Sequence, residues 1–147
     1  MNWQRGAVVL MATVILVTLA WAQLSPETQR CMNHMKQAIR AVQMYMQDYD
    51  EMFPPATNPT KLLEAIGPYL KDNKTALTCP ATGKSYRTNP HISWRAKSNY
   101  PNLGEVVVLY DSVPHKDKRY VVGFADGTVK AVTEKELAAI KQKARLK

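Results

Sequence analysis

The sequence predicts an α+β fold, with a long N-terminal helix packed on a small antiparallel sheet and a further helix at the C-terminus. Three observations lead to this prediction. Apolar residues recur every three or four positions between residues 26 and 50, which is the period of an amphipathic helix. β-branched residues are frequent from residue 105 to 132, where Asp126 and Gly127 form a hairpin-turn signal. Thr133 and Glu136 then have the spacing of a capping box, which starts a helix.

The first 22 residues are interpreted as a targeting segment that precedes this domain. A short basic start ends at Arg5, residues 6–20 are almost entirely apolar, and Ala20-Trp21-Ala22 has the small-x-small pattern of a signal-peptidase site. We therefore divide the chain into a signal peptide or membrane anchor, residues 1–22, and a pilin-like α+β domain, residues 23–147. If the segment is not cleaved, residues 6–24 are long enough to span a bilayer. Both alternatives predict an extracytoplasmic domain in the periplasm, at the cell surface or secreted, and the second anchors it in the inner membrane.

Two helices are expected in the first half of the domain. Ser25 is a suitable N-cap and Pro26 a suitable first residue for a helix of about 25 residues, which Phe53-Pro54-Pro55 ends. Its apolar stripe consists of Cys31, Met35, Ala38, Val42, Tyr45 and Tyr49. We expect the last three of these to face the sheet. A second, short helix begins at residues 58–60, and Gly67-Pro68 should bend or divide it.

The second half of the domain supplies the sheet. Residues 72–101 show little periodicity apart from residues 92–94, so we expect an irregular segment with one short strand at most. Strands are predicted at 105–110, 119–125 and 128–132. The residues expected to oppose the helix stripe are Val107, Leu109, Val122 and Phe124. In the last helix Leu137, Ile140 and Ala144 should point inward.

Composition and cysteine content narrow the class of protein. Hydrophobic residues make up 46% of the chain and charged residues 22%, which is typical of a globular protein. The net charge of +8 is compatible with nucleic acid, anionic lipid or an acidic partner, but no zinc-finger or RNP-type pattern is present, so nucleic-acid binding is not expected. Cys31 and Cys79 lack metal-binding spacing and fit an oxidising compartment. We favour a disulfide between them; two buried free thiols are the alternative.

Several short strings in one order resemble a known family. These are a Cys-x-Asn-x-x-Lys-Gln string at residues 31–37, a Tyr-x-x-Asp-x-Asp string at 45–50, Cys-Pro at 79–80, Asp-Ser at 111–112, and a histidine followed by Asp-Gly. Together they resemble bacterial prepilin-type and type II secretion pseudopilin-like proteins with a C-terminal His-x-Asp-Gly "processing-associated" motif. The motif positions are Asn33, Lys36, Gln37, Tyr45, Asp48, Asp50, Pro80, Asp111, Ser112, His115, Asp126 and Gly127. The resemblance covers residues 31–137 and implies a pilin-like fold, with other pilin-like or secretion-apparatus proteins as partners.

This resemblance predicts a non-enzymatic, extracytoplasmic structural or interaction protein, acting as a minor component of a secretion or pilus-type apparatus. The alternative is a freely secreted binding module that keeps a pilin-type head and no longer assembles. Cleavage after Gly6, as in a prepilin leader, is a third alternative for this segment. The leader departs from the family pattern, because Met11 then occupies the fifth mature position, where glutamate is usual. We therefore expect that the chain does not form homopolymeric filaments.

No catalytic set or cofactor motif is expected. Asp111, Ser112 and His115 can be drawn as a Ser/His/Asp set, but Asp-Ser after a strand is more simply a turn. No nucleophile elbow or metalloprotease motif occurs. Calcium is a weak candidate at Asp48, Asp50 and Asp117. The competing interpretation is a solvated charge cluster or helix-end capping, since the EF-hand spacing is absent.

Overall fold

The computed structural model describes residues 23–71 and 73–147. The predicted leader, residues 1–22, lies outside the described residues. Within the described part of the chain, no helix is both long and apolar enough to cross a membrane.

Helix α1, Pro26–Asp48, begins where the sequence predicts. The Ser25 side chain accepts a hydrogen bond from the Thr28 backbone N–H at 3.1 Å, and Pro26 is the first helical residue. The helix ends earlier than the Pro54-Pro55 pair requires, because Asp50 and Glu51 adopt left-handed backbone conformations. A cap that is local in sequence thus fixes the start of α1, whereas the two left-handed residues fix its end.

Helix α2, Pro59–Ile66, is capped by the Asn58 side chain, which accepts from the Lys61 N–H at 2.9 Å. A 3-10 turn, Gly67–Leu70, follows it, so the predicted division at Gly67-Pro68 is confirmed. Strand β1 is only two residues long, Arg87–Thr88. The periodic residues 92–94 are not a strand, because Pro90–Ile92 forms a 3-10 turn and Trp94 has a left-handed backbone.

The sheet has four antiparallel strands in the order β1-β2-β3-β4. Strand β2 is Val107–Tyr110, β3 is Tyr120–Phe124 and β4 is Val129–Val132. Gly127 has φ of 97° in the predicted hairpin turn between β3 and β4, a conformation that favours glycine. Helix α3, Glu134–Lys143, follows, and its capping box between Thr133 and Glu136 is formed as predicted.

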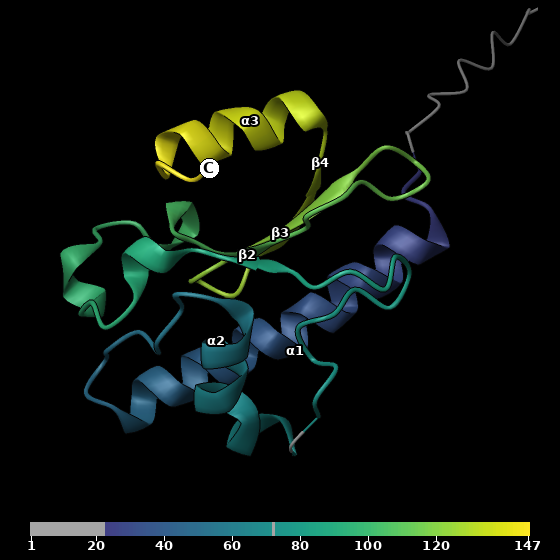
Figure 1. Cartoon of the computed structure of the whole chain (residues 1–147). Coiled ribbons are helices and arrows are strands. Elements are labelled where there is room, and N and C mark those ends of the chain that lie inside the picture. The colour runs from purple at the N-terminus through teal and green to yellow at the C-terminus, as the bar shows by residue number, and fades with distance from the viewer. Residues whose placement is uncertain (1–22, 72) are drawn as a thin grey trace, which may run out of the picture.

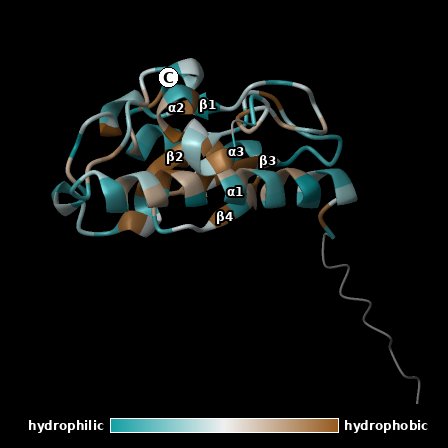
Figure 2. Ribbon diagram, turned by 90° about the horizontal axis from the view of Figure 1, so that it is seen from below, coloured by the Kyte–Doolittle hydropathy of each residue, from teal (hydrophilic) through white to brown (hydrophobic). Residues whose placement is uncertain are grey.

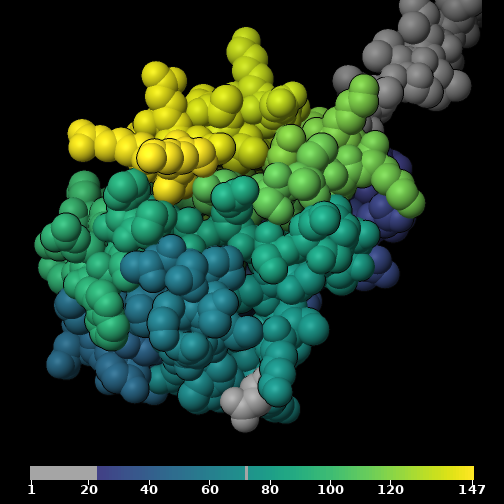
Figure 3. Space-filling model, viewed as in Figure 1, coloured from purple at the N-terminus to yellow at the C-terminus, as the bar shows by residue number. Residues whose placement is uncertain are grey.

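The elements form three layers, with the sheet in the middle, α1 and α2 on one side and α3 on the other (Figure 1). The first apolar core lies between α1 and the sheet and includes Met35, Ile39, Val42, Leu109 and Val121. The second lies between the sheet and α3 and includes Val107, Val122, Phe124, Val132 and Leu137. In the space-filling view α3 and the C-terminal residues form one side of the molecule, and α2 lies on the opposite side (Figure 3). The α+β prediction, with a helix on a small antiparallel sheet and a C-terminal helix, is confirmed.

The predicted pairing of helix and sheet faces is only partly right. Val42 is buried in the α1-side core together with Leu109. Tyr45 is buried as well, but its ring contacts Tyr69 of the 3-10 turn and Tyr49. Val107, Val122 and Phe124 belong instead to the core on the α3 side. Strand β3 is buried on both faces, so its apolar run has no alternation from which the α1 face can be read.

Two local features also differ from the predicted pairing of helix and sheet faces. A register shift between Val107 and Leu109 interrupts the alternation of β2, so that Val108 and Leu109 both belong to the α1-side core. Tyr49 was expected in the buried stripe but is 53% exposed; its ring stacks on Tyr45 with centroids 4.2 Å apart. Tyr49 is the C-cap residue, one position beyond the last helical residue Asp48, so it does not continue the buried stripe of α1.

Gly123 sets how closely α1 approaches the sheet. A Cβ atom at this position would lie 2.8 Å from Cδ1 of Ile39 and 3.1 Å from Sδ of Met35. Carbon atoms normally pack at about 3.5–4.0 Å, so the contact leaves no room for a side chain. Glycine in the middle of β3 therefore marks a close approach between helix and strand.

Candidate functional site

A disulfide between Cys31 and Cys79 joins α1 to the loop that follows α2. The two Cα atoms are 5.7 Å apart, and neither cysteine is exposed. Cys79 is held in a tight turn by its backbone bonds to Lys84 and Gly83, at 2.8 and 2.9 Å. The bridge spans 48 positions of sequence and ties the irregular segment to the core helix.

His115, in the loop between β2 and β3, lies against this disulfide. Its side chain is fully buried, and Nε2 is 3.2 Å from Sγ of Cys79. Nδ1 is 3.0 Å from the carbonyl oxygen of Arg119. Because a carbonyl oxygen only accepts hydrogen bonds, Nδ1 must carry a proton. In the neutral imidazole the free electron pair of Nε2 is then directed at the sulfur of Cys79.

Asp111 extends the cluster on the other side of the imidazole. Its Oδ2 accepts a hydrogen bond from the Val121 N–H at 2.6 Å and lies 3.5 Å from Nδ1 of His115. Burial raises the pKa of Asp111 to about 6, against the opposing effects of the Val121 hydrogen bond and the nearby imidazole. Tyr86 is also buried, and its hydroxyl has no hydrogen-bond partner among the described residues. Burial and, secondarily, the Asp111 carboxylate raise the pKa of this phenol.

Ser112 does not join this cluster. Its hydroxyl donates to the carbonyl of Ser85 at 3.1 Å, on an exposed turn at the end of β2. His115 makes its contacts with Arg119, Asp111 and Cys79, and no substrate can reach the buried imidazole without opening the core. The structure therefore does not assemble the Ser/His/Asp set that the sequence could suggest.

The Asp-Gly part of the motif holds the β3–β4 hairpin. Asp126 accepts hydrogen bonds from both the backbone N–H and the hydroxyl of Thr128, and these bonds lower the pKa of its carboxyl. Gly127 lies close to Gln43 of α1, where a Cβ would come within 3.2 Å of the amide nitrogen. Gln43 also donates to the Ala125 carbonyl at 3.3 Å. This end of the motif fixes the hairpin against α1.

The three calcium candidates do not form one site. Asp117 lies at the start of α1, where it accepts from the Ser25 N–H at 2.9 Å and from the Thr28 hydroxyl at 2.8 Å. Asp48 ends α1 and accepts from the Tyr69 hydroxyl at 2.6 Å; Asp50 is close to it in sequence and exposed. A helix of 23 residues separates Asp117 from the other two, which is about 33 Å at 1.5 Å per residue. No ion can bridge that distance.

The remaining motif residues have different surroundings. Tyr45 is buried, whereas Asn33, Lys36 and Gln37 lie on the exposed side of α1, the hydrophilic face that is turned to the viewer in Figure 2. Pro80 is exposed next to the buried Cys79. Among the residues of the family-like strings, the structure thus brings Cys79, Asp111 and His115 together. It leaves Asn33, Lys36 and Gln37 of α1 on the surface.

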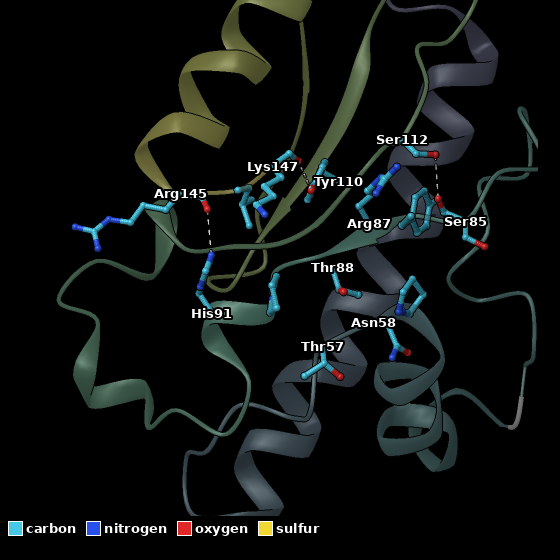
Figure 4. Close-up of a pocket in the computed structure, with 14 residues that line it drawn as sticks. Thr57, Asn58, Ser85, Arg87, Thr88, His91, Tyr110, Ser112, Arg145 and Lys147 are labelled. Atoms are coloured by element: carbon cyan, nitrogen blue, oxygen red, sulfur yellow. Dashed lines mark hydrogen bonds between the residues drawn. The ribbon is translucent and has the colours of Figure 1, made fainter.

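A basic pocket, not anticipated from the sequence, opens between β1, the start of α2 and the C-terminal tail (Figure 4). Its volume is about 710 Å³, and its cationic side chains are Arg87, Arg145 and Lys147, with the imidazole of His91 beside them. None of its 14 described lining residues is acidic. The tail is held by His91, whose Nε2 is 3.1 Å from the carbonyl oxygen of Arg145 (Figure 4). The sequence showed the basic C-terminus but not its position beside β1.

The fold and these two sites define an α+β protein with a disulfide-pinned helix, and the buried disulfide is compatible with an oxidising, extracytoplasmic compartment. In comparisons with known proteins, no family model matches the chain, and neither a curated protein nor a solved structure matches it.

Proposed function

We propose that the chain is a non-enzymatic, extracytoplasmic structural protein of the pseudopilin type, which acts by protein–protein contact as a minor component of a secretion or pilus-type apparatus. The observation that carries the proposal is the position of α1. One face of this 23-residue helix is buried against the antiparallel sheet and against α2 with its 3-10 turn, and the opposite face, which we call the free face, is exposed in the described part of the chain.

The free face of α1 has the character of a contact surface. It carries two cations and several amide side chains, and toward its C-terminal end Met44 is 47% exposed. Its members are Asn33, Lys36, Gln37, Arg40, Met44 and Gln47. Because the disulfide and the Asp117 hydrogen bonds hold α1 in place, this surface is preorganised and loses little conformational entropy on binding.

The freely secreted binding module is the second candidate, and two observations favour it. Ser25 has an extended backbone and caps α1, so α1 starts at Pro26 and is not continued as a helix through Ser25 toward the N-terminus. The basic pocket offers a binding site for an anionic ligand. In this alternative the domain acts alone, and the free face of α1 has no partner.

Site-directed photocrosslinking in the native host distinguishes the two candidates. A photoreactive residue replaces Lys36 or Gln47 on the free face of α1, and Lys135 on the exposed side of α3 serves as the matched control. We expect adducts with another pilin-like or secretion-apparatus protein from the α1 positions and none from the control. Recovery of the chain as an uncrosslinked monomer at every position, in the soluble secreted fraction, would overturn the proposal.

The proposal also has a consequence for filaments. Met11 supplies no carboxylate to neutralise the α-amino group of a neighbouring apolar helix, and an unpaired charge taken out of water is costly. We expect electron microscopy of shear fractions to show no filament made of this chain alone. Its presence as a minor component of mixed filaments agrees with the proposal.

A further inference from the structure

Three metal-binding atoms converge in the core beside α1. The Sγ atoms of Cys31 and Cys79 and a ring nitrogen of His115 all lie within 4.8 Å of one another, and all three residues are buried. Among residues 23–71 and 73–147 this is the one group of three or more such side chains with metal-binding geometry. Two thiolates and an imidazole are ligands that Zn²⁺ prefers in proteins.

The imidazole is already oriented as in a metal site. Its Nδ1 donates to the Arg119 carbonyl at 3.0 Å, which leaves the Nε2 electron pair facing the sulfur of Cys79 at 3.2 Å. A disulfide sulfur carries no hydrogen, so this electron pair has no donor to accept from. Metal-bound histidines almost always donate their second ring N–H to a backbone carbonyl or a carboxylate. Here the Arg119 carbonyl accepts this hydrogen bond, and Oδ2 of Asp111 lies 3.5 Å from the same nitrogen.

The separation between Cys79 Sγ and His115 Nε2 is close to the one that Zn²⁺ requires. Bonds of about 2.0–2.3 Å in a tetrahedral site hold the sulfur and nitrogen ligand atoms about 3.5–3.8 Å apart. The Cys79–His115 separation of 3.2 Å needs to widen by only a few tenths of an ångström. The two sulfur atoms must part, which the cleavage of their bond allows.

We propose that the chain with both cysteines reduced folds around one Zn²⁺ ion, held by Cys31 Sγ, Cys79 Sγ and His115 Nε2, and that formation of the disulfide expels the ion. Binding releases the two thiol protons to solvent. On oxidation by a disulfide such as oxidised glutathione, the two thiolates give up two electrons and form the Cys31–Cys79 bond. The glutathione disulfide takes these electrons and two protons and becomes two thiols. The zinc ion leaves with its charge unchanged.

Burial determines when the ion can enter. The three ligands are enclosed by the folded core, so Zn²⁺ binds as the reduced chain folds, and its binding free energy adds to the free energy of folding. The disulfide form has no thiolate to offer. The newly exported, still reduced chain is therefore the zinc-binding form.

The test uses the full chain, unfolded and reduced with a phosphine, then refolded with or without Zn²⁺ and desalted. We expect one Zn²⁺ per chain, a gain of helical circular dichroism over the zinc-free sample, and release of the ion to a chromophoric chelator in step with disulfide formation by oxidised glutathione. The oxidised chain should bind none. Binding of Zn²⁺ by the reduced chain without a gain of helical signal would overturn the proposal.

Two histidine variants make the test specific. His115→Gln keeps both cysteines and should lower the zinc affinity of the reduced chain at least about tenfold, the smallest effect usual for a residue that supports a metal site. His91→Gln is the matched control, because His91 contacts the Arg145 carbonyl in the basic pocket, and it should bind as the wild type does. The oxidised fold of each variant is checked by circular dichroism. Wild-type affinity in His115→Gln would show that the thiols alone hold the ion and would refute the three-ligand site.

Discussion

Substitution of Gly123 by alanine tests the close approach of α1 to β3. The new Cβ would lie 2.8 and 2.9 Å from two carbons of Ile39 and 3.1 Å from the sulfur of Met35. Both neighbours are fully buried and cannot move into solvent. Overpacking of this kind costs about 1–3 kcal/mol. Gly123 has an ordinary negative φ, so alanine also reduces the freedom of the unfolded chain and returns about 0.4–1 kcal/mol. We expect a net loss of about 1–2 kcal/mol.

A double-mutant cycle with Ile39→Ala identifies the cause of this loss. Ile39→Ala removes the two carbons that Cβ would meet and by itself should cost about 2–5 kcal/mol. If the clash is the cause, the double variant loses less than the sum of the single losses, by about 1 kcal/mol. Urea unfolding followed by circular dichroism measures each free energy.

Gly83→Ala is the control, because it makes the same glycine-to-alanine substitution at a position away from α1. Gly83 has φ of 66° and nothing within 4 Å of a new Cβ, so its alanine variant suffers backbone strain but no clash. Its loss should add to that of Ile39→Ala without coupling. Full additivity of Gly123→Ala with Ile39→Ala, or an unchanged free energy of unfolding in Gly123→Ala, would refute the close-approach argument.

Three further outcomes follow from the structure. Replacing Cys31 and Cys79 together by alanine should lower the free energy of unfolding by about 4 kcal/mol in the chain-entropy model, because the bridge closes a loop of 48 positions; an unchanged urea midpoint contradicts this. Val42→Asp places a charge in the α1-side core and should cost several kcal/mol, so an unchanged melting temperature would exclude Val42 from that core. Partial burial raises the pKa of Asp117, but its hydrogen bonds with Ser25 and others outweigh this effect, and the net pKa is lowered. A lowered pKa in the folded state means that the stabilisation is complete above the usual aspartate pKa of about 3.9 and is lost as the pH falls through the folded-state value. We therefore expect Asp117→Asn to unfold more easily at neutral pH and to show a weaker dependence of stability on pH below about 4; parallel pH profiles of variant and wild type would contradict the role of Asp117.

The sequence by itself determined the elements whose ends are set by neighbouring residues. The caps at Ser25, Asn58 and Thr133 each bond to a residue three positions along the chain, so their signals are complete within four residues. The Asp126-Gly127 hairpin is equally local, because the turn needs only a positive φ at Gly127 and an acceptor before it.

Only the tertiary structure decided which faces and which side chains meet. Strand β3 is covered on both sides, so a shift of one residue exchanges Val121 for Val122 without changing the apolar pattern. Which face of β3 is turned to α1 depends on Gly123, where the helix approaches too closely for any side chain. This contact joins Gly123 to Ile39 and Met35, which lie some 80 positions earlier in the chain. The contact between His115 and Cys79 likewise joins residues 36 positions apart, so it too depends on the packing of distant segments. Contacts between distant segments depend on how the helices and the sheet pack as bodies, and neither the spacing of residues nor their local propensities encodes that packing.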